Sequence, residues 1–595
     1  MRQLLEQNYN ELFINYNLVK PVETKDLSSI IRNSLEDFIE RNKKVAIYCN
    51  GGHTKMLMSD FIFELKSVRY IVDNYAKKSD NQGFFMIRDD EIEKSGIDAV
   101  IISSFKFKDQ IIKKLKEEHP ALHILNIYDE LAQKGIILHS DYYYCNHPYH
   151  HYHTLNSLQR KIHHSIDKSE LEPIYLSIIE KYIQIKDFKT ALFYCKELCK
   201  IRNTEKYCHM SEDLDNLYNM EKKAAEHIDK KNVLMFCMDG LRREDLSDNF
   251  MPKLTKNVNN KGFSFENAYS VSTSTFESLI PAYSKNDDLS TAYYNRNYIS
   301  EEECSFLKKA KNQDRSIYFY TDVEHIIESP SIHYSGKSQT VTEKIWDFIV
   351  DGVDEKNGLF YIHESYESHF TFSNPYTKER LISEGTAMLF DFLPQKGESL
   401  RTNYERQHMD ALKYLDDVVS PFMDKLRCRI ILYSDHGNMI LKEGCRLKDV
   451  KETKLTCDEE WIRIAYAVFS PEMGVGKSNR LISLMSFDDI MVSLLDEQAY
   501  EIPKNEYIKV VRSELYNPDF SYLYKKMNKE GYLLAFEAFI FHEGYKLVVY
   551  SDGTVELFTV ENDTKIMNKK LIQRLIRKIE HSITVCDIDN INEFR

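Results

Sequence analysis

The sequence of 595 residues lacks the features that mark several classes of protein. No stretch approaches the ~18 consecutive apolar residues that a membrane-spanning helix requires, so no transmembrane segment is expected. The first residues, MRQLLEQNYNELFINYN, are too polar to form the core of a signal peptide. The 11 cysteines are odd in number and scattered, without a CxxC pair, which predicts reduced thiols and a cytoplasmic protein.

An excess of basic residues is also missing. The chain has 79 Lys and Arg against 93 Asp and Glu, which gives a formal net charge of −14. Because a nucleic-acid-binding protein is expected to carry a basic face, no nucleic-acid partner is predicted. The apolar share of 43% and the charged share of 29% are those of a globular chain. The length predicts about three to five folding units of ~100–200 residues each.

Residues 41–140 have the pattern of a Rossmann-like domain. Short apolar runs alternate with helical segments, which predicts a parallel sheet with crossover helices. The turn CNGGHT at 49–54 follows the first run. It resembles the Gly-x-Gly-Gly-His turn of the nucleotide-sugar-binding domain found in some bacterial sugar acyltransferases and related glycan enzymes. That resemblance implies a nucleotide or nucleotide-sugar site at the matching residues, Gly51, Gly52, His53 and Asp73. Cys49 replaces the first glycine, and the alternative is a degenerate, purely structural domain.

The segments on either side of this domain are expected to be helices and connectors. Residues 1–40 have the pattern of an amphipathic helix and a connector, and residues 141–227 that of a His- and Tyr-rich linker followed by a helical spacer. Six histidines occur between positions 147 and 164, but without the ordered spacing of metal ligands. A linker is therefore favoured over a metal site. One hairpin after residue 170 resembles the tetratricopeptide type, but one hairpin does not make a solenoid.

Residues 228–595 contain the chemistry-bearing motifs. Two predicted buried strands end in acidic residues, the first in Asp239 and the second in Asp435-His436. Open α/β sheets place ligands at such strand ends. With a hydroxyl from the tract Ser272–Thr275, these side chains complete an O/O/N/O set suited to one divalent cation, Zn or Mn. Hydroxyls at a helix start are either simple caps or a nucleophile that faces a phosphate or sulfate group.

The order of these motifs over about residues 231–440 resembles the sulfatase-like branch of the alkaline phosphatase superfamily. The segment STSTFESLIP is similar to T-S-T-x-x-S-L-P of the bacterial phosphoethanolamine transferases, and the phosphoglycerol transferases share this layout. The sulfatase signature C/S-x-P-x-R is absent from this tract. The resemblance implies that Thr275 is the nucleophile, that His369 is the loop histidine of the site, and that the metal ligands are Asp239, Thr275, Asp435 and His436.

The transferases carry a second histidine after DHG, and this chain has none there. Lys442 and Lys448 are nearest, and Lys448 is the candidate for binding the transferred group, with Arg242 as a further possibility. His363 is expected to be buried beside its strand rather than catalytic.

The sequence thus predicts an α/β protein: a three-layer α/β/α alkaline phosphatase-like domain preceded by a Rossmann-like domain and a helical spacer. The predicted function is metal-dependent phosphoryl transfer or hydrolysis on a phosphorylated or glycan-linked small molecule. A sulfatase-like ester hydrolase is one alternative. An inactive scaffold or sugar-nucleotide sensor in polysaccharide synthesis is another.

Overall fold

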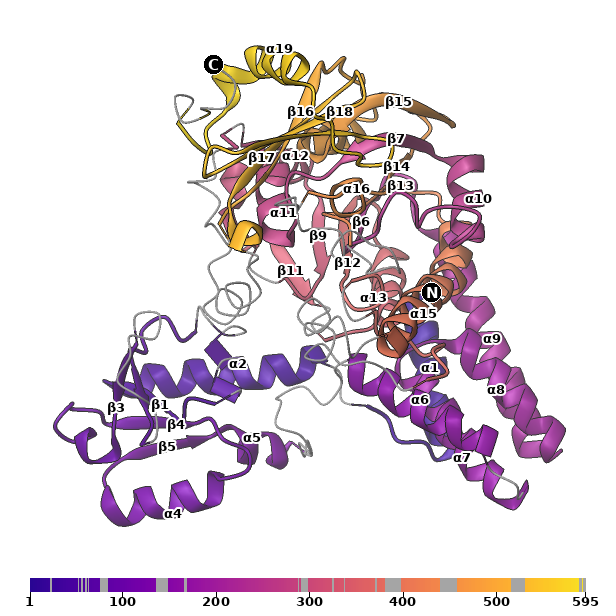
Figure 1. Cartoon of the computed structure of the whole chain (residues 1–595). Coiled ribbons are helices and arrows are strands. Elements are labelled where there is room, and N and C mark those ends of the chain that lie inside the picture. The colour runs from indigo at the N-terminus through magenta and orange to yellow at the C-terminus, as the bar shows by residue number, and fades with distance from the viewer. Residues whose placement is uncertain are drawn as a thin grey trace. The chain divides into compact units, whose positions relative to one another are not determined.

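The computed structural model describes residues 1–21, 24–51, 53, 54, 57, 58, 61, 64–74, 84–134, 148–164, 168–286, 288, 289, 298–323, 326–335, 338–369, 372–379, 398–438, 457–514, 530–587 and 591 (Figure 1). The chain divides into two compact units, residues 20–147 and residues 1–19 with 148–595. The described helices include none with the length and hydropathy of a membrane span.

The unit of residues 20–147 is built on a five-stranded, all-parallel sheet in the order β3-β2-β1-β4-β5. The order reverses between β1 and β4, as it does in doubly wound sheets. All four residues of β1 and of β4 are buried, as expected for central strands covered on both faces. The elements are β1 (Val45–Tyr48), β2 (Tyr70–Val72), β3 (Phe85–Ile87), β4 (Ala99–Ile102), β5 (His123–Asn126), α2 (Thr24–Arg41), η1 (Asp89–Glu91), α4 (Lys108–Glu118) and α5 (Ile127–Gln133).

The larger unit begins with helices that share a core with its main sheet. Their apolar residues, such as Tyr152, Ile178 and Leu214, belong to the same buried cluster as Phe236 and Ile362 of the sheet. The expected linker at 148–164 is therefore an amphipathic helix, because Tyr152 and Leu155 recur on one buried face. The expected N-terminal segment 1–40 is divided, since α1 joins this unit and α2 joins the other. The helices are α1 (Arg2–Tyr16), α6 (Pro148–His164), α7 (Lys168–Gln184), α8 (Phe188–Ile201) and α9 (Glu205–His227).

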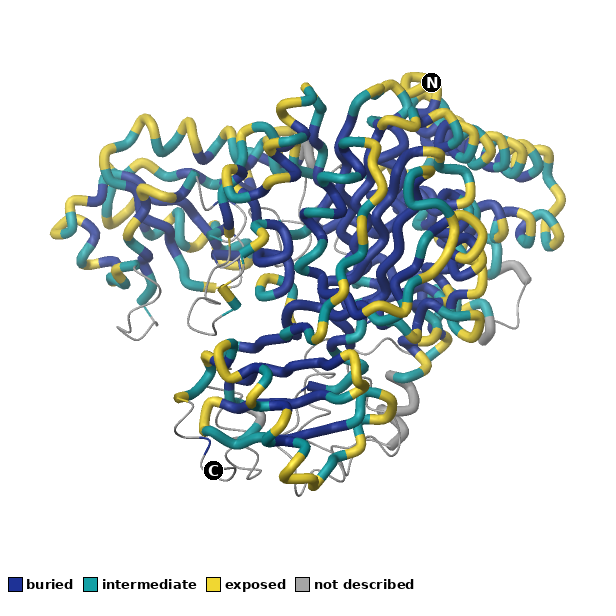
Figure 2. Tube along the Cα trace, turned by 90° about the horizontal axis from the view of Figure 1, so that it is seen from above, coloured by how far each residue is buried: buried dark blue, intermediate teal, exposed yellow. Residues whose placement is uncertain are grey.

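The centre of this unit is an eight-stranded sheet in the order β11-β9-β12-β6-β13-β14-β7-β15. The five strands from β11 to β13 are parallel, and β14 is antiparallel to both of its neighbours. The central strands β6, β12, β13 and β14 are buried along their whole length, and Figure 2 shows the buried interior of the chain in dark blue. Their bounds are β6 (Val233–Met238), β7 (Phe263–Tyr269), β9 (Ser316–Tyr320), β11 (Ile332–Ser335), β12 (Gly358–Glu364), β13 (Arg429–Tyr433), β14 (Tyr466–Phe469) and β15 (Gly476–Ser483).

Helices cover both faces of this sheet. Leu234, Phe236 and Met238 of β6 point into one apolar cluster, whereas Val233 and Cys237 point into another. This alternation is the period of a strand with two buried faces. The first cluster includes residues of α10 (Pro252–Lys261), α13 (Val341–Gly352) and α15 (Glu398–Met423), and the second includes residues of α11 (Thr275–Ser284), α12 (Ser305–Asn312) and α17 (Phe487–Leu495). The predicted three-layer α/β/α architecture is confirmed.

The C-terminal part adds a four-stranded antiparallel sheet in chain order. One face of it packs against Ile572 and Leu575 of α19. The elements are β16 (Tyr507–Arg512), β17 (Phe536–Phe541), β18 (Tyr545–Tyr550), β19 (Val555–Thr559) and α19 (Lys569–Ile579). Short elements complete the unit: β8 (Ile299–Ser300), β10 (Ile327–Glu328), α16 (Glu459–Ile462), η3 (Glu301–Glu303), η4 (Leu484–Ser486), η5 (Glu530–Leu533) and η6 (Glu580–Ser582).

Candidate active site and metal centre

The ends of three neighbouring parallel strands bring the acidic candidates together. Asp239 follows β6, which lies between β12 and β13, and Asp435 follows β13. Gly240 turns the chain with a φ of 75°, and its N–H donates to Asp435 Oδ1 at 3.2 Å. A Cβ at Gly240 would lie 2.1 Å from Nδ2 of Asn438, so glycine is required here on two grounds. The strand ends thus place both carboxylates at one edge of the sheet.

Four side chains predicted as metal ligands converge at this edge. Thr275 Oγ1 lies 3.4 Å from Asp239 Oδ2 and 3.4 Å from His436 Nε2. His436 Nε2 lies 3.5 Å from Asp239 Oδ1 and 3.4 Å from Asp435 Oδ2. Ligand atoms about 2.1 Å from one tetrahedral ion are about 3.4 Å apart, so each of these four pairs has the spacing of two ligands of one small cation.

Two buried carboxylate oxygens at this edge of the sheet also support a cation site. Asp239 Oδ1 and Asp435 Oδ2 accept no hydrogen bond from the described residues, although both residues are buried. A buried carboxylate oxygen without a partner is costly unless a charge compensates it. Asp239 and Asp435 also belong to a group of possible ligand atoms, together with His363, that lie within 4.8 Å of one another. The residues therefore fit a divalent cation.

The electrostatics keep Asp239 ionised. Burial raises the pKa of its carboxyl, but the charge of His369, the hydrogen bond from His363 and the charge of His436 outweigh burial and hold the pKa well below its usual range. Burial lowers the pKa of His436, and Asp435 and Asp239 outweigh it, so that pKa is raised. An ionised carboxylate is the form that binds a cation.

Thr275 is the first residue of α11, and the rest of the hydroxyl tract is directed elsewhere. Ser272 is buried and its hydroxyl donates to Glu277 Oε2 at 2.7 Å, and Thr273 is buried as well. Ser274 is exposed, takes the N-cap position and makes no side-chain capping bond. The backbone N–H groups in the first turn of α11 are free of partners within the helix, and the helix dipole is positive at this end. Both effects favour an anionic group at the N-terminus of the helix.

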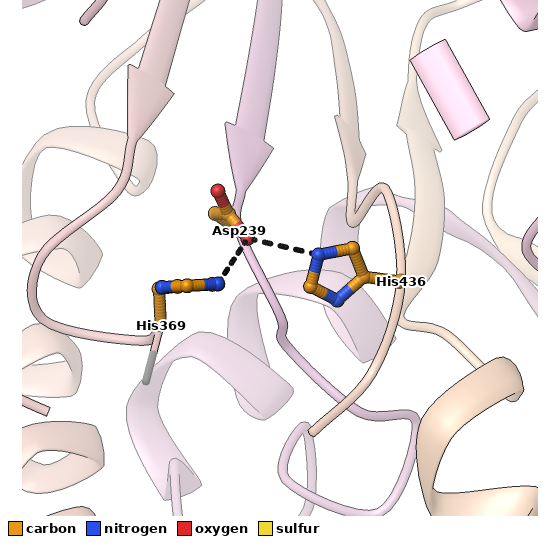
Figure 3. Close-up of side chains that lie close together, drawn as sticks. All are labelled: Asp239, His369 and His436. Carbon is orange, nitrogen blue, oxygen red and sulfur yellow. Dashed lines mark ion pairs between the residues drawn. The ribbon is translucent and has the colours of Figure 1, made fainter. Parts of the chain in front are cut away.

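Two histidines complete the surroundings of Asp239. His369 Nε2 lies 3.7 Å from Asp239 Oδ1, and its side chain is 33% exposed. Figure 3 shows its ring and that of His436 on two sides of the Asp239 carboxylate. His363 is buried on β12, as expected, yet its Nε2 lies 3.3 Å from Asp239 Oδ2. The expectation of a purely structural His363 therefore missed its contact with the site.

The His369 turn is held by a buried carboxylate. Glu364 Oε1 accepts the backbone N–H groups of Tyr366, Glu367 and Ser368 at 2.9, 2.6 and 3.1 Å. The Ser368 hydroxyl donates to the carbonyl of Asp239 at 2.8 Å. These bonds fix the turn to the strand end, so the position of His369 relative to Asp239 is set by the backbone.

Three basic residues were predicted as candidates for binding the transferred group, and the structure describes only one of them. Lys442 and Lys448 lie outside the described residues. Arg242 is fully buried, and its guanidinium pairs with Asp245 Oδ1 at 2.5 Å and with Glu460 Oε2 at 3.2 Å. Arg242 is therefore committed to a buried ion-pair network rather than facing a substrate.

The turn after β1 in the smaller unit is organised by internal bonds. Asp73 Oδ2 accepts the N–H of Asn50 at 2.9 Å, and His53 Nδ1 pairs with the Tyr128 hydroxyl. Gly51 is exposed, and Gly52 lies outside the described residues. Cys49, in place of the first glycine, has a φ of 86°. The backbone thus keeps the conformation that a glycine would adopt there.

Residues 231–496 match the sulfatase family model. No curated protein matches the chain. Among solved structures, the phosphonate monoester hydrolase from Silicibacter pomeroyi is 10% identical over 60% of this chain and 96% of its own, with a TM-score of 0.43. The phosphonate monoester hydrolase of Agrobacterium radiobacter is 9% identical over 59% and 95%, with a TM-score of 0.42. The zinc complex of the C-terminal periplasmic domain of EcEptC from Escherichia coli is 14% identical over 45% and 82%, with a TM-score of 0.31.

The family match begins just before β6, which ends at Asp239, and extends past Thr275 and His436 to the end of α17. It therefore includes every element that contributes to the cluster at the strand ends. Residues 231–496 of this chain thus form a domain that matches the sulfatase family model.

Proposed function

We propose that the protein is a metal-dependent phosphotransferase or phosphohydrolase that uses Thr275 as its nucleophile. The observation that carries the proposal is the position of Thr275 Oγ1, 3.4 Å from both Asp239 Oδ2 and His436 Nε2 at the N-terminus of α11. The substrate we propose is a phosphorylated or glycan-linked small molecule. The glycan part rests on analogy with related enzymes.

Asp239, Asp435, His436 and Thr275 would hold the cation, for which we propose Zn or Mn. A divalent ion there supplies positive charge, which lowers the pKa of a hydroxyl and offsets negative charge in the transition state. The Thr275 hydroxyl donates toward Asp239 Oδ2, so this carboxylate is the acceptor at hand for its proton. The first-turn amides of α11 face the group that Thr275 would attack.

The reaction would proceed in two steps. Thr275 Oγ1 forms a bond to phosphorus while the bond to the leaving oxygen breaks in line with it. The phosphothreonine then passes its phosphoryl group to an acceptor hydroxyl or to water, which regenerates the threonine. His369, partly exposed beside Asp239, would stabilise the equatorial oxygens. For Lys448 this role stays a prediction, as does the cytoplasmic location.

The identity of the nucleophile favours phosphate over sulfate. Sulfatases of the formylglycine type mature a cysteine or a serine, and Thr275 carries a Cβ methyl that prevents the same oxidation to an aldehyde. A hydroxyl nucleophile beside a cation is suited to phosphoryl transfer. Four convergent ligand atoms argue against an inactive scaffold.

A screen of leaving-group donors tests this proposal. The metal-loaded protein is incubated with nitrophenyl phosphate, bis(nitrophenyl) phosphate and nitrophenyl sulfate, and nitrophenol release is measured together with intact mass. We expect turnover of a phosphate ester and a phosphoryl adduct on the protein. Turnover of the sulfate alone would favour the sulfatase-like ester hydrolase. If no donor is turned over, the result would favour the inactive scaffold.

For the smaller unit we propose a nucleotide or nucleotide-sugar site at Gly51, Gly52 and His53. Asp73 Oδ2 accepts the N–H of Asn50, which holds this carboxylate beside the turn, and there we propose that it binds a ribose hydroxyl. Calorimetry of the full chain with nucleotide sugars should show binding that His53→Ala weakens about tenfold, because a buried side chain that shapes the turn is lost. No heat with any nucleotide or nucleotide sugar would support the degenerate alternative.

A further inference from the structure

A cavity of about 570 Å³ lies among the helices of the larger unit, apart from the residues of the Asp239 site. Side chains of α6, α7, α8 and α15 line it, together with the segment 375–378. Its volume falls within the ~300–1,000 Å³ typical of small-molecule sites. None of the predicted site residues that the structure describes lines this cavity, so the proposed phosphoryl transfer does not explain it.

The inner wall of this cavity carries polar groups that suit a hydroxyl-rich ligand. Gln159 Nε2 donates to the Tyr182 hydroxyl at 3.0 Å, and the Tyr376 hydroxyl donates to Asp417 Oδ2 at 3.0 Å. Tyr194 stacks on Tyr182 with ring centroids 5.6 Å apart and planes 16° from parallel. A phenol or amide group with one bond made can still donate to or accept from a ligand hydroxyl.

Basic side chains gather at the same cavity. Arg160, Lys378 and Lys413 line it and form no ion pair with the described part of the chain. The fourth basic residue, Lys189, is 3.7 Å from Asp417 Oδ1, and Lys253 also pairs with Asp417. Lys189 and Lys253 thus compensate the charge of Asp417, and Asp410 is the other acidic residue in the lining, beside four basic residues. In a chain of net charge −14, this is a local excess of positive charge.

We propose that this cavity binds an anionic saccharide, that is, a sugar that carries a phosphate or a sulfate group. Arg160, Lys378 and Lys413 would bind the anion, because guanidinium and ammonium groups make strong charge-assisted hydrogen bonds to such oxygens. The phenols and Gln159 would bind the sugar hydroxyls. Phe193, which is 57% exposed at the cavity, offers an apolar surface for the C–H face of the ring.

A nucleotide fits these observations less well. A base is usually bound between or upon open aromatic faces. Tyr182 and Tyr194 instead stack on each other, and Tyr376 packs edge-on against Tyr414 at 5.2 Å. Each of these rings is thus already packed against another ring, and Tyr182 is fully buried.

The cavity is connected to the His369 turn through the backbone. Asn156 of α6 donates to the carbonyls of Thr377 and Glu379, and Tyr152 of the same helix donates to Glu367. Phe372 N–H donates to the carbonyl of His369 at 2.7 Å. A ligand against Thr377 would therefore contact the segment that follows the His369 turn. The inference does not depend on Thr275 chemistry.

Calorimetry tests the proposal with four probes: glucose 6-phosphate, glucose 6-sulfate, glucose and inorganic phosphate. The background is the full chain with Asp435→Ala and His436→Ala, so that the Asp239 site cannot turn the probes over. We expect one of the two anionic sugars to bind at least tenfold more tightly than glucose or inorganic phosphate, and the stronger of the two identifies the anion. Binding should weaken with added salt, because salt screens the charges.

Arg160→Ala with Lys413→Ala should weaken that binding at least tenfold. Lys378→Ala with Lys413→Ala, two exposed side chains, provides a second variant that keeps the fold. Lys196→Ala, an exposed lysine of α8 that does not line the cavity, is the matched control and should bind as the parent does. Equal binding by the double variants, equal affinity for glucose, or no binding of any probe would overturn the proposal. None of these results bears on phosphoryl transfer by Thr275.

Discussion

Thr275→Ala is expected to abolish turnover of the best donor, with a loss of about a thousandfold or more, as when a covalent nucleophile is removed. Among the described residues, Thr275 supplies the hydroxyl oxygen that lies 3.4 Å from both Asp239 Oδ2 and His436 Nε2. Its loss removes the atom that would bond to phosphorus, and the Ser272 hydroxyl is already bonded to Glu277. Steady-state release of nitrophenol and the intact mass after donor incubation measure the effect.

The neighbouring hydroxyls provide matched controls for this variant. Ser274→Ala should keep near-normal activity, because Ser274 is exposed and makes no capping bond. Thr275→Ser should keep part of the activity, since it retains the hydroxyl but loses the methyl group that restricts χ1. All three variants should unfold within about 1 kcal/mol of the wild type, as expected for surface or half-buried positions. Full activity of Thr275→Ala with loss in Ser274→Ala would place the nucleophile one residue earlier.

The strand-end residues could be predicted because their signal is local. A run of buried residues that ends in an acidic residue predicts a parallel strand and the edge where it stops, and this located Asp239 and Asp435. The alternation of Leu234 and Phe236 with Val233 and Cys237 between two cores also follows from the strand period. Local patterns of this kind were sufficient to predict the three-layer α/β/α fold.

Other features depend on contacts that no local pattern contains. His363 lies within a buried strand, where a histidine looks like any core residue until β6 places Asp239 beside it. The His-rich segment forms α6, whose Tyr152 bonds to Glu367 more than two hundred residues later. Arg242 follows Asp239 closely in sequence, yet Asp245 and Glu460 hold it inside the protein. In each case a contact with a residue from another part of the fold determines where the side chain lies.

The same tertiary placement determines how the cation site should respond to mutation. The wild-type protein is expected to bind about one Zn or Mn per chain, and Asp435→Ala with His436→Ala is expected to bind none. The double variant removes one carboxylate and one imidazole from a set whose atoms lie 3.4–3.5 Å apart. Of the four proposed ligands only Asp239 and Thr275 then remain, whereas structural and catalytic zinc sites have three or four protein ligands. Turnover should be lost together with the metal.

Metal analysis and thermal unfolding measure this result independently of activity. A cation at a hundredfold excess over its Kd stabilises the folded state by about 2.7 kcal/mol, so added metal should raise the Tm of the wild type. The double variant should show no such rise, and a chelator should leave its Tm unchanged. Without metal the variant should be about as stable as the wild type. It loses the bond that Gly240 N–H donates to Asp435 Oδ1, but it also loses the buried Oδ2, which accepts no hydrogen bond from the described residues. His581→Ala, at an exposed histidine, is the control and should bind metal normally. Unchanged metal content in the double variant would mean that the cation is held by other residues of the chain.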